Sequence, residues 1–195
     1  MTMMTELKRG ILFTIVTMVL FGGVYHVAIW GIGRVAFPRQ AEGSLIRGAD
    51  GTVVGSALIA QKFTQPQYFH PRPSAVDYNA ASTGGSNLGP SNPDHLKAVR
   101  DRLDAVVKLE GVAASAVPAE MLTTSGGGLD PDIPPAAADL QAARVARARQ
   151  VTVDRVRDLV RAHTVPPALG VFGRSRTHVL ELNLALDRAF GKTAR

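Results

Sequence analysis

Residues 10–33, GILFTIVTMVLFGGVYHVAIWGIG, form a run of 24 residues without Asp, Glu, Lys or Arg. As an α-helix this run is roughly 36 Å long, because each residue adds about 1.5 Å, and that length crosses a bilayer with some tilt. Lys8 and Arg9 precede the run, and Tyr25 and Trp30 lie in its second half, where aromatic rings suit a membrane interface. The pattern predicts a stub at residues 1–9 and one transmembrane helix over residues 10–36.

A cleaved signal peptide is the alternative interpretation of a basic stub followed by an apolar run. Its apolar core has only about 7–15 residues and ends in an A-x-A-like cleavage site. Here the run is longer and FPRQ (residues 37–40) follows it, which favours an uncleaved anchor. Basic residues lie on both sides of the run, so counting them leaves the orientation open.

The apolar run contains one ionisable side chain, His26, and a pair of small residues, Gly22 and Gly23. An ionisable group at membrane depth is a candidate for function. A neutral imidazole that hydrogen-bonds to a neighbouring helix serves packing alone, and glycine lets helices approach closely. We interpret these three residues as a contact with a partner helix.

The composition limits what the remaining chain can be. Hydrophobic residues make up 46% of the 195 residues and charged residues 19%, a balance typical of a folded chain of ordinary domain size. The sequence has no Cys, which excludes disulfides, thiolate catalysis and thiolate metal sites. The net charge of +6 suits phosphate, an anionic lipid or an acidic partner without deciding among them.

Short strands and helices are predicted after the anchor. Two β-rich stretches, residues 44–48 and 52–61, flank Asp50-Gly51, a dipeptide typical of hairpin turns. Asn92 as a cap, Pro93 at the first helical position and Gly111 just past the end predict a helix between them.

The second half of the chain predicts helices over residues 135–149 and 153–163. A strand is predicted at residues 177–181, with Asn183 as the cap of a helix over residues 184–190, although LELNLAL also fits the two-residue period of a strand. Strands at both ends of a helical middle indicate one α+β domain over residues 37–195.

Residues 63–92 show no helical periodicity and are rich in Pro, Gly and aromatic residues. A loop this long in a compact domain is usually disordered or functional, and its aromatics favour an ordered docking loop. The alternative is that its Asn, Gly and Pro residues only form turns and caps. The predicted docking residues are Tyr68, Phe69, His70, Pro71, Arg72, Tyr78, Asn79, Asn87 and Leu88.

Six arginines crowd the two helices predicted over residues 135–163, with few acids beside them. Such a cluster is either a solvated helix face or a surface for anionic headgroups or an acidic partner. Its members are Arg144, Arg147, Arg149, Arg155, Arg157 and Arg161.

Catalytic and ligand-binding motifs are poorly supported. Leu186 stands where a phosphate-binding loop ending in GKT (residues 191–193) needs Gly, and Ser86 lacks the last Gly of a nucleophile elbow. The histidines have no metal-ligand spacing, and no nucleic-acid-binding motif accompanies the arginines. We therefore expect no catalytic residues, no metal and no nucleic-acid partner.

The loop sequences carry a resemblance to a known family. The runs YFHPRPS (68–74), YN (78–79), GGSNLGPSNP (84–93), SGGGLDP (125–131), PAAA (135–138), RVA (144–146) and VLELNLALD (179–187) follow one another in order. In this order they resemble the C subunit of the Kdp-type potassium-transporting ATPase. The single anchor and the Asp50-Gly51 hairpin are similar too, so the resemblance covers nearly the whole chain.

The resemblance implies an accessory subunit of a high-affinity potassium uptake complex in the bacterial inner membrane. Its partners would be a potassium-translocating subunit and an ATP-hydrolysing P-type subunit, with membrane lipid around the anchor. The chain has no D-K-T-G sequence and one predicted span, so it neither accepts a phosphoryl group in that way nor forms a pore by itself. The topology that the resemblance implies places residues 1–9 in the cytoplasm and residues 37–195 outside it.

The family is described as a catalytic chaperone that raises the pump subunit's affinity for ATP. The STGGS run (residues 82–86) faintly resembles an ABC-type signature loop, which makes Ser82, Gly84, Gly85 and Ser86 candidate nucleotide contacts. No tightly bound cofactor is expected, and ATP would be met only in a transient complex with the pump subunit. An extracytoplasmic domain meets little ATP, so we favour a mechanical role in which this domain caps the translocating subunit. Direct nucleotide binding remains the alternative.

Overall fold

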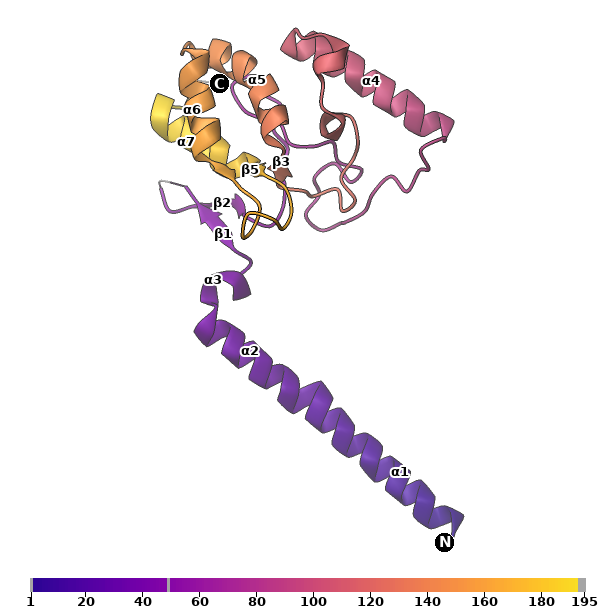
Figure 1. Cartoon of the computed structure of the whole chain (residues 1–195). Coiled ribbons are helices and arrows are strands. Elements are labelled where there is room, and N and C mark those ends of the chain that lie inside the picture. Colours follow the sequence, from indigo (N-terminus) through magenta and orange to yellow (C-terminus); the bar gives the residue numbers. More distant parts are fainter. Residues whose placement is uncertain (1, 49, 193–195) are drawn as a thin grey trace. The chain divides into compact units, whose positions relative to one another are not determined.

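The computed structural model describes residues 2–48 and 50–192, and it divides into two compact units, Met1–Leu45 and Ile46–Arg195 (Figure 1). The first unit is dominated by one long helix. The second contains helices and short strands, which confirms the α+β class with one apolar helix at the N-terminal end.

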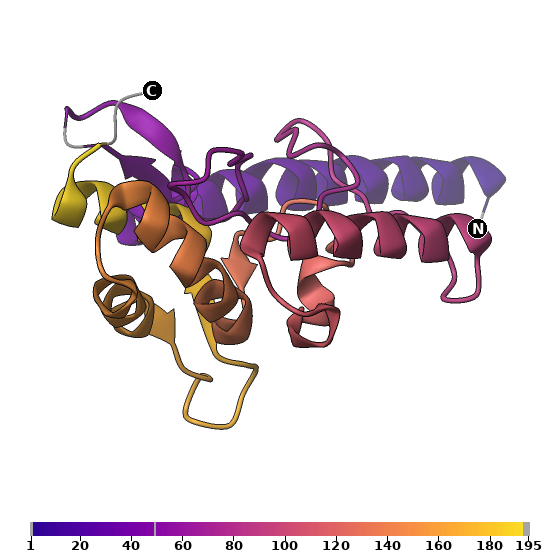
Figure 2. The same ribbon diagram turned by 90° about the horizontal axis from the view of Figure 1, so that it is seen from above.

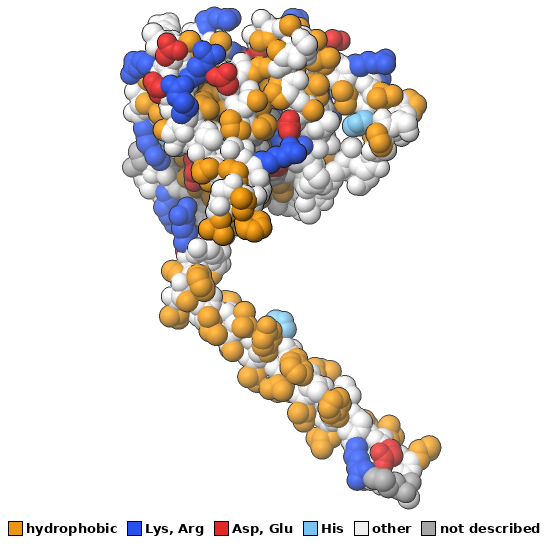
Figure 3. Space-filling view, viewed as in Figure 1, with side chains coloured by type: hydrophobic (Ala, Val, Ile, Leu, Met, Phe, Trp, Pro, Cys, Tyr) orange, Lys and Arg blue, Asp and Glu red, His pale blue; other side chains and the backbone are white. Residues whose placement is uncertain are grey.

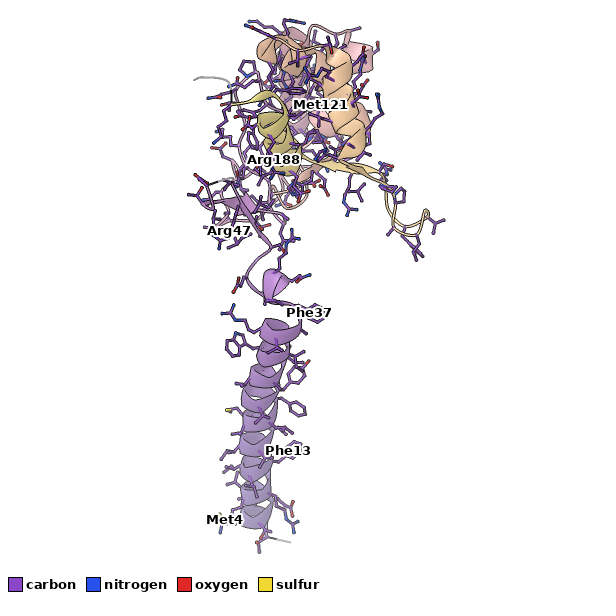
Figure 4. All side chains as sticks on the ribbon, turned by 90° about the vertical axis from the view of Figure 1, so that its left-hand side faces the viewer. Met4, Phe13, Phe37, Arg47, Met121 and Arg188 are labelled. Carbon is purple, nitrogen blue, oxygen red and sulfur yellow. The ribbon has the colours of Figure 1, made fainter. Side chains whose placement is uncertain are left out.

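The long helix runs through α1 (Met3–Thr17), a π-helical segment η1 (Met18–Val24) and α2 (Tyr25–Ala36). None of its residues is buried, and its side chains project all around the ribbon (Figure 4). It is long and apolar enough to cross a membrane. The helix begins at Met3 rather than at the predicted residue 10, because the polar stub is itself helical and pairs Arg9 with Glu6 at 3.1 Å. A short helix, α3 (Pro38–Ala41), follows the apolar segment.

The predicted hairpin is confirmed as β1 (Leu45–Arg47) paired with β2 (Val53–Ser56). Asp50 stabilises the turn, since its carboxylate accepts from the backbone N–H of Thr52 at 3.1 Å and from the Thr52 hydroxyl at 2.7 Å. The second strand ends at Ser56 instead of residue 61. The chain turns there, and Gln61 folds back to donate to the carbonyl of Val54 at 2.7 Å.

A three-stranded antiparallel sheet and three helices form the core of the second unit. The sheet has the order β3 (Asp132–Ile133), β5 (Arg176–His178), β4 (Thr164–Val165), and α5 (Pro135–Arg149), α6 (Val153–Ala162) and α7 (Val179–Phe190) pack with it (Figures 1 and 2). The alanines of α5 let α6 approach closely. The core residues include Phe69, Ile133, Ala137, Ala138, Ala142, Val145, Val156, Val160, Leu182 and Leu186.

The predictions for the middle of the chain are confirmed, and those for its end are partly wrong. Helix α4 (Pro93–Glu110) has Asn92 as its cap, accepting from the N–H of Asp94 at 2.8 Å, and Gly111 follows with φ 70°. The C-terminal strand stops at His178, and α7 starts at Val179. His178 caps α7, whereas Asn183, the predicted cap, lies inside the helix and is buried.

Helix α4 leaves part of its apolar surface exposed. Leu96 is 44% exposed and Leu109 is 45% exposed, and Glu110 is the residue of α4 that is buried. Two 3₁₀ turns, η2 (Ala114–Ala116) and η3 (Ala119–Met121), follow α4 and lead to the glycine-rich residues 125–128.

Candidate functional site

The predicted docking loop passes through the interior of the domain. Its residues 66–70, here called the clamped segment, have no helical or strand partner and are held by side chains of α5 and α7. Asn183 accepts from the N–H of Phe69 at 2.8 Å and donates to its carbonyl at 3.0 Å. Gln141 does the same for His70, at 2.7 and 3.1 Å. Each amide side chain forms the two hydrogen bonds that a neighbouring strand would form, so the N–H and carbonyl groups of Phe69 and His70 all have partners.

Two arginines of α5 complete the clamp. Arg144 donates to the carbonyls of Pro66 and Tyr68 at 2.7 and 2.9 Å and to the carboxylate of Glu110 at 2.9 Å. Its side chain is 5% exposed, and that of Glu110 is 1% exposed. A buried arginine with this many partners positions backbone and is not free to bind a ligand.

Arg149 holds the residue of the clamped segment that lies between the two contacts of Arg144. It donates to the carbonyl of Gln67 at 2.8 Å, to that of Gly191 at 3.0 Å and to the carboxylate of Asp187 at 2.7 Å. The prediction of six surface arginines is therefore wrong for Arg144 and Arg149. Arg157 and Arg161 are exposed and pair with Asp139 and Asp158.

The aromatic side chains of the loop turn inward, which contradicts the expected exposure. Phe69 is fully buried in the core. Tyr68 donates its hydroxyl to Asp187 at 3.1 Å, and the guanidinium of Arg149 lies over its ring at 5.0 Å. Burial, together with the charge of Asp187, raises the pKa of Tyr68. The rings are buried because side chains of α5 and α7 form hydrogen bonds with the backbone of Tyr68 and Phe69 and hold it in the interior of the domain.

The next residues of the loop are partly buried and tied to the domain. Tyr78 donates its hydroxyl to the carbonyl of Arg72 at 2.8 Å, and Arg72 pairs with Asp130 at 3.0 Å. Pro71 and His70 line a cavity of about 290 Å³ beneath α4. Burial and the charge of Arg144 lower the pKa of His70 to about 4, so its imidazole is neutral at neutral pH.

The cavity beneath α4 is also lined by a carboxylate that can accept a further hydrogen bond. One oxygen of Glu110 accepts from Arg144, and the other, buried, has no hydrogen-bond partner among the described residues. Burial raises the pKa of Glu110. Lys62, Arg102 and Tyr78 line the same cavity, which makes it mixed in charge. Residues 2–48 and 50–192 contain no group of three His, Cys, Asp or Glu side chains that could hold a metal ion.

The two glycine-rich loops pack against each other. The N–H of Gly84 donates to the carbonyl of Gly127 at 3.0 Å, and a Cβ on Gly85 would lie 3.0 Å from the carbonyl oxygen of Gly126. Gly128 has φ 71°, and a Cβ on this residue would lie 2.8 Å from the carbonyl oxygen of Gly84. Close backbone contact thus accounts for these glycines, and the N–H of Gly84 is already used. Ser82 and Ser86 are exposed.

Three of the predicted docking residues do lie on the surface. Asn79 is exposed and its carboxamide oxygen accepts from the N–H of Ala81. Asn87 is exposed with φ 53°, and Leu88 is 40% exposed. Exposed polar and apolar residues together form the part of the predicted docking surface that remains accessible.

The membrane-depth candidates lie at the irregular part of the long helix. Gly22 and Gly23 belong to η1, and a Cβ on either would meet nothing within 4 Å. The Nδ1 of His26 lies 2.6 Å from the carbonyl oxygen of Phe21, so this ring nitrogen bonds within its own helix.

Comparison with known proteins identifies the family. The model of the family described as KdpC, K+-transporting ATPase, c chain, matches residues 7–188. The chain belongs to the KdpC family. A potassium-transporting ATPase KdpC subunit from Polaromonas naphthalenivorans is 51% identical over 180 residues, which is 91% of both chains. The KdpC subunit of Geobacter sulfurreducens is 48% identical over 187 residues, covering 94% of this chain and 98% of that protein.

The family match confirms the resemblance that the loop sequences carried. It spans both the long helix and the second unit, so KdpC membership applies to the whole architecture described above. The buried polar residues Gln141, Asn183 and Glu110 were missed by the sequence analysis. A polar residue on an otherwise apolar helix face, such as Asn183 within LELNLAL, is the signal that could have revealed them.

Proposed function

We propose that the chain is a non-catalytic accessory subunit of an ATP-driven potassium uptake complex. The proposal rests on KdpC membership together with one observation: the described residues contain a single helix, Met3–Ala36, that could cross a membrane. One span does not enclose an ion pathway, so the chain acts through other subunits. These are a potassium-translocating subunit and an ATP-hydrolysing P-type subunit, whose association it stabilises.

The proposed location is the bacterial inner membrane, with the second unit on the extracytoplasmic side. There it caps the outer face of the translocating subunit. Protease treatment of intact spheroplasts tests this topology. Digestion of the second unit from outside is expected, whereas protection until lysis would contradict it.

The exposed part of the loop, Asn79, Asn87 and Leu88, is the proposed docking surface for the translocating subunit. Leu88→Glu places a charge in that surface and is expected to reduce co-purification of the translocating subunit. Leu58→Glu is the matched control, because Leu58 is 61% exposed and lies outside the loop. If both variants co-purify the translocating subunit as well as the wild-type chain does, docking through Leu88 is contradicted.

In the membrane, Gly22, Gly23 and His26 are proposed to contact a partner helix. His26→Leu keeps the apolar character of the span and removes the free ring nitrogen. Weaker association of the subunits in detergent is expected, with normal membrane insertion. Undiminished association would remove His26 from the interface.

We further propose that the subunit raises the affinity of the pump subunit for ATP without holding a cofactor itself. The test compares the KM for ATP of the complex with and without this chain. A lower KM in its presence is expected, and identical values would restrict its role to assembly.

Direct nucleotide binding by Ser82, Gly84, Gly85 and Ser86 is the second candidate function. The exposure of Ser82 and Ser86 favours it, and the use of the Gly84 N–H by Gly127 counts against it. A photoreactive ATP analogue that labels residues 82–86 of the isolated chain, with competition by ATP, would support it. If residues 82–86 are not labelled, or if ATP does not reduce the labelling, direct nucleotide binding is excluded and only the accessory role remains.

A further inference from the structure

The loop between β4 and β5 is the most apolar exposed segment of the second unit. Residues 165–173, VPPALGVFG, contain no polar side chain, and we call them the apolar finger. Leu169 is 90% exposed, Val171 75% and Phe172 66%. The loop extends away from the helices of its domain in Figure 2, and Figure 3 shows hydrophobic side chains gathered over it. Exposed apolar groups gathered in one protrusion indicate a contact surface.

Most backbone N–H groups of the apolar finger form hydrogen bonds within the finger. Ala168 and Phe172 exchange two hydrogen bonds at 2.8 and 2.9 Å, Gly170 donates to Pro167 at 3.0 Å, and Val171 donates to Ala168 at 3.2 Å. Pro166 and Pro167 have no N–H to satisfy. Four of the five N–H groups of residues 168–172 therefore already have a protein acceptor. Pairing of these N–H groups lowers the cost of taking this backbone out of water, because an unpaired polar group is expensive in hydrocarbon.

Charges at the base of the finger face outward with positive sign. Arg174 pairs loosely with Glu120 at 3.6 Å, and Arg176 pairs with Asp132 at 3.1 Å. The arginine side chains are 92% and 54% exposed, whereas their acidic partners are 33% and 25% exposed. The guanidinium groups are thus the outer members of both pairs. An apolar tip above outward-facing cations matches the headgroup layer of an anionic bilayer.

The chain keeps the second unit close to a bilayer. Nine residues, 37–45, separate the end of α2 from Ile46, where the second unit begins. Fully extended, they span at most about 30 Å. A domain of this size has a radius of gyration of roughly 15 Å, so any of its faces can reach the bilayer surface.

We propose that the apolar finger inserts into the lipid bilayer next to the anchor, with Leu169, Val171 and Phe172 below the headgroups. Arg174 and Arg176 then lie at the level of the lipid phosphates. The finger supplies a second attachment that limits how the second unit turns on its tether. This inference rests on the membrane anchoring proposed above.

The test places one indole at the tip of the finger in the full chain. Trp30 is the chain's one tryptophan, so Trp30→Phe with Phe172→Trp moves the fluorophore to the tip. The protein is reconstituted into phosphatidylethanolamine and phosphatidylglycerol vesicles. A blue-shifted emission and quenching by lipids brominated near the headgroup are expected. The matched control is Trp30→Phe with Leu96→Trp, on α4, which is expected to be quenched by acrylamide and not by brominated lipid.

Two results at position 172 would overturn the proposal. Emission from position 172 that equals the control and ignores brominated lipid means that the finger stays in water. A blue shift that needs the other subunits, without lipid quenching, means that a protein surface binds the finger instead. The unsubstituted chain reports the anchor separately: if brominated lipids quench Trp30 and not position 172, only the finger proposal fails. If Trp30 is not quenched, the membrane anchoring fails and the finger proposal falls with it.

Discussion

The clamped segment and the apolar finger both contain proline and phenylalanine, yet they place their phenylalanine rings oppositely. Phe69 of the clamped segment is fully buried, and Phe172 of the finger is 66% exposed. The difference lies in the partners of the backbone. Residues 66–70 receive hydrogen bonds from Gln141, Arg144, Arg149 and Asn183, whereas the finger bonds to itself. Loop composition alone therefore does not decide which way side chains point.

The most direct test of this comparison substitutes the two phenylalanines. Phe69→Ala is expected to lower the free energy of unfolding by about 3–5 kcal/mol, the usual loss for a buried phenylalanine. Phe172→Ala is expected to change it by less than about 0.5 kcal/mol, because that ring is exposed. Denaturant unfolding of the full chain in detergent, followed by circular dichroism, measures both. Similar losses at both positions would refute the contrast.

The second test removes a clamp and leaves the core. Asn183→Ala leaves the N–H and carbonyl of Phe69 without partners, and each buried unpaired group costs about 1–3 kcal/mol. The expected loss of unfolding free energy is about 2–4 kcal/mol. Asn79→Ala, an exposed position, is the control and is expected to cost about 0.5 kcal/mol. A loss at position 183 no larger than the control would mean that the clamp does not hold the segment.

The third test uses the proton affinity of His70. Its pKa is about 4 in the folded chain, against an ordinary 6.5. Between these pH values the unfolded chain binds a proton that the folded chain does not, so the unfolding free energy falls as the pH drops from 6.5 to 4. The loss reaches at most about 3 kcal/mol, since each unit of pKa corresponds to about 1.4 kcal/mol.

The control for this pH effect is His70→Gln. Glu110 and the other titrating groups act in both proteins, so the difference between the two stability profiles isolates His70. A flatter profile for the variant between pH 6.5 and pH 4 is expected. Parallel profiles would show that His70 is accessible to protons in the folded chain.

The smallest effect concerns the contact between the glycine-rich loops. Gly85→Ala forces a Cβ to within 3.0 Å of the Gly126 carbonyl oxygen, and a loss of about 1 kcal/mol is expected from the overpacking. Gly126→Ala is the matched control, because its Cβ would meet nothing within 4 Å. Equal stability of the two variants would argue that the loops are free to separate.

The sequence predicted those elements whose signals are local. The bounds of α4 follow from Asn92, Pro93 and Gly111, which act within one turn of the helix ends. The bounds of α5 and the position of the hairpin turn at Asp50-Gly51 were predicted for the same reason, whereas the end of the second hairpin strand was not. The family was recognisable from loop sequence because turns need particular residues at particular positions.

The remainder depended on contacts between distant residues. Phe69 and Asn183 are 114 positions apart, and His70 and Gln141 are 71 positions apart, so no window of sequence shows that they meet. The predicted cap at Asn183 failed because a polar residue among leucines was read as a helix end. The protrusion of the apolar finger likewise depends on the fold, although its nine successive residues without a polar side chain, VPPALGVFG, stand in the sequence.

The clamp also fixes an order of events during synthesis. The helix side chains that bond to residues 66–70 lie between residues 141 and 187, and the helix that supplies Asn183 is the last of the described chain. Until α7 has been made, the backbone of Phe69 has no partner and its ring has no core to enter. Contacts of such long separation close slowly. A chain that stops before residue 179 would thus leave the ring and backbone of Phe69 exposed to water.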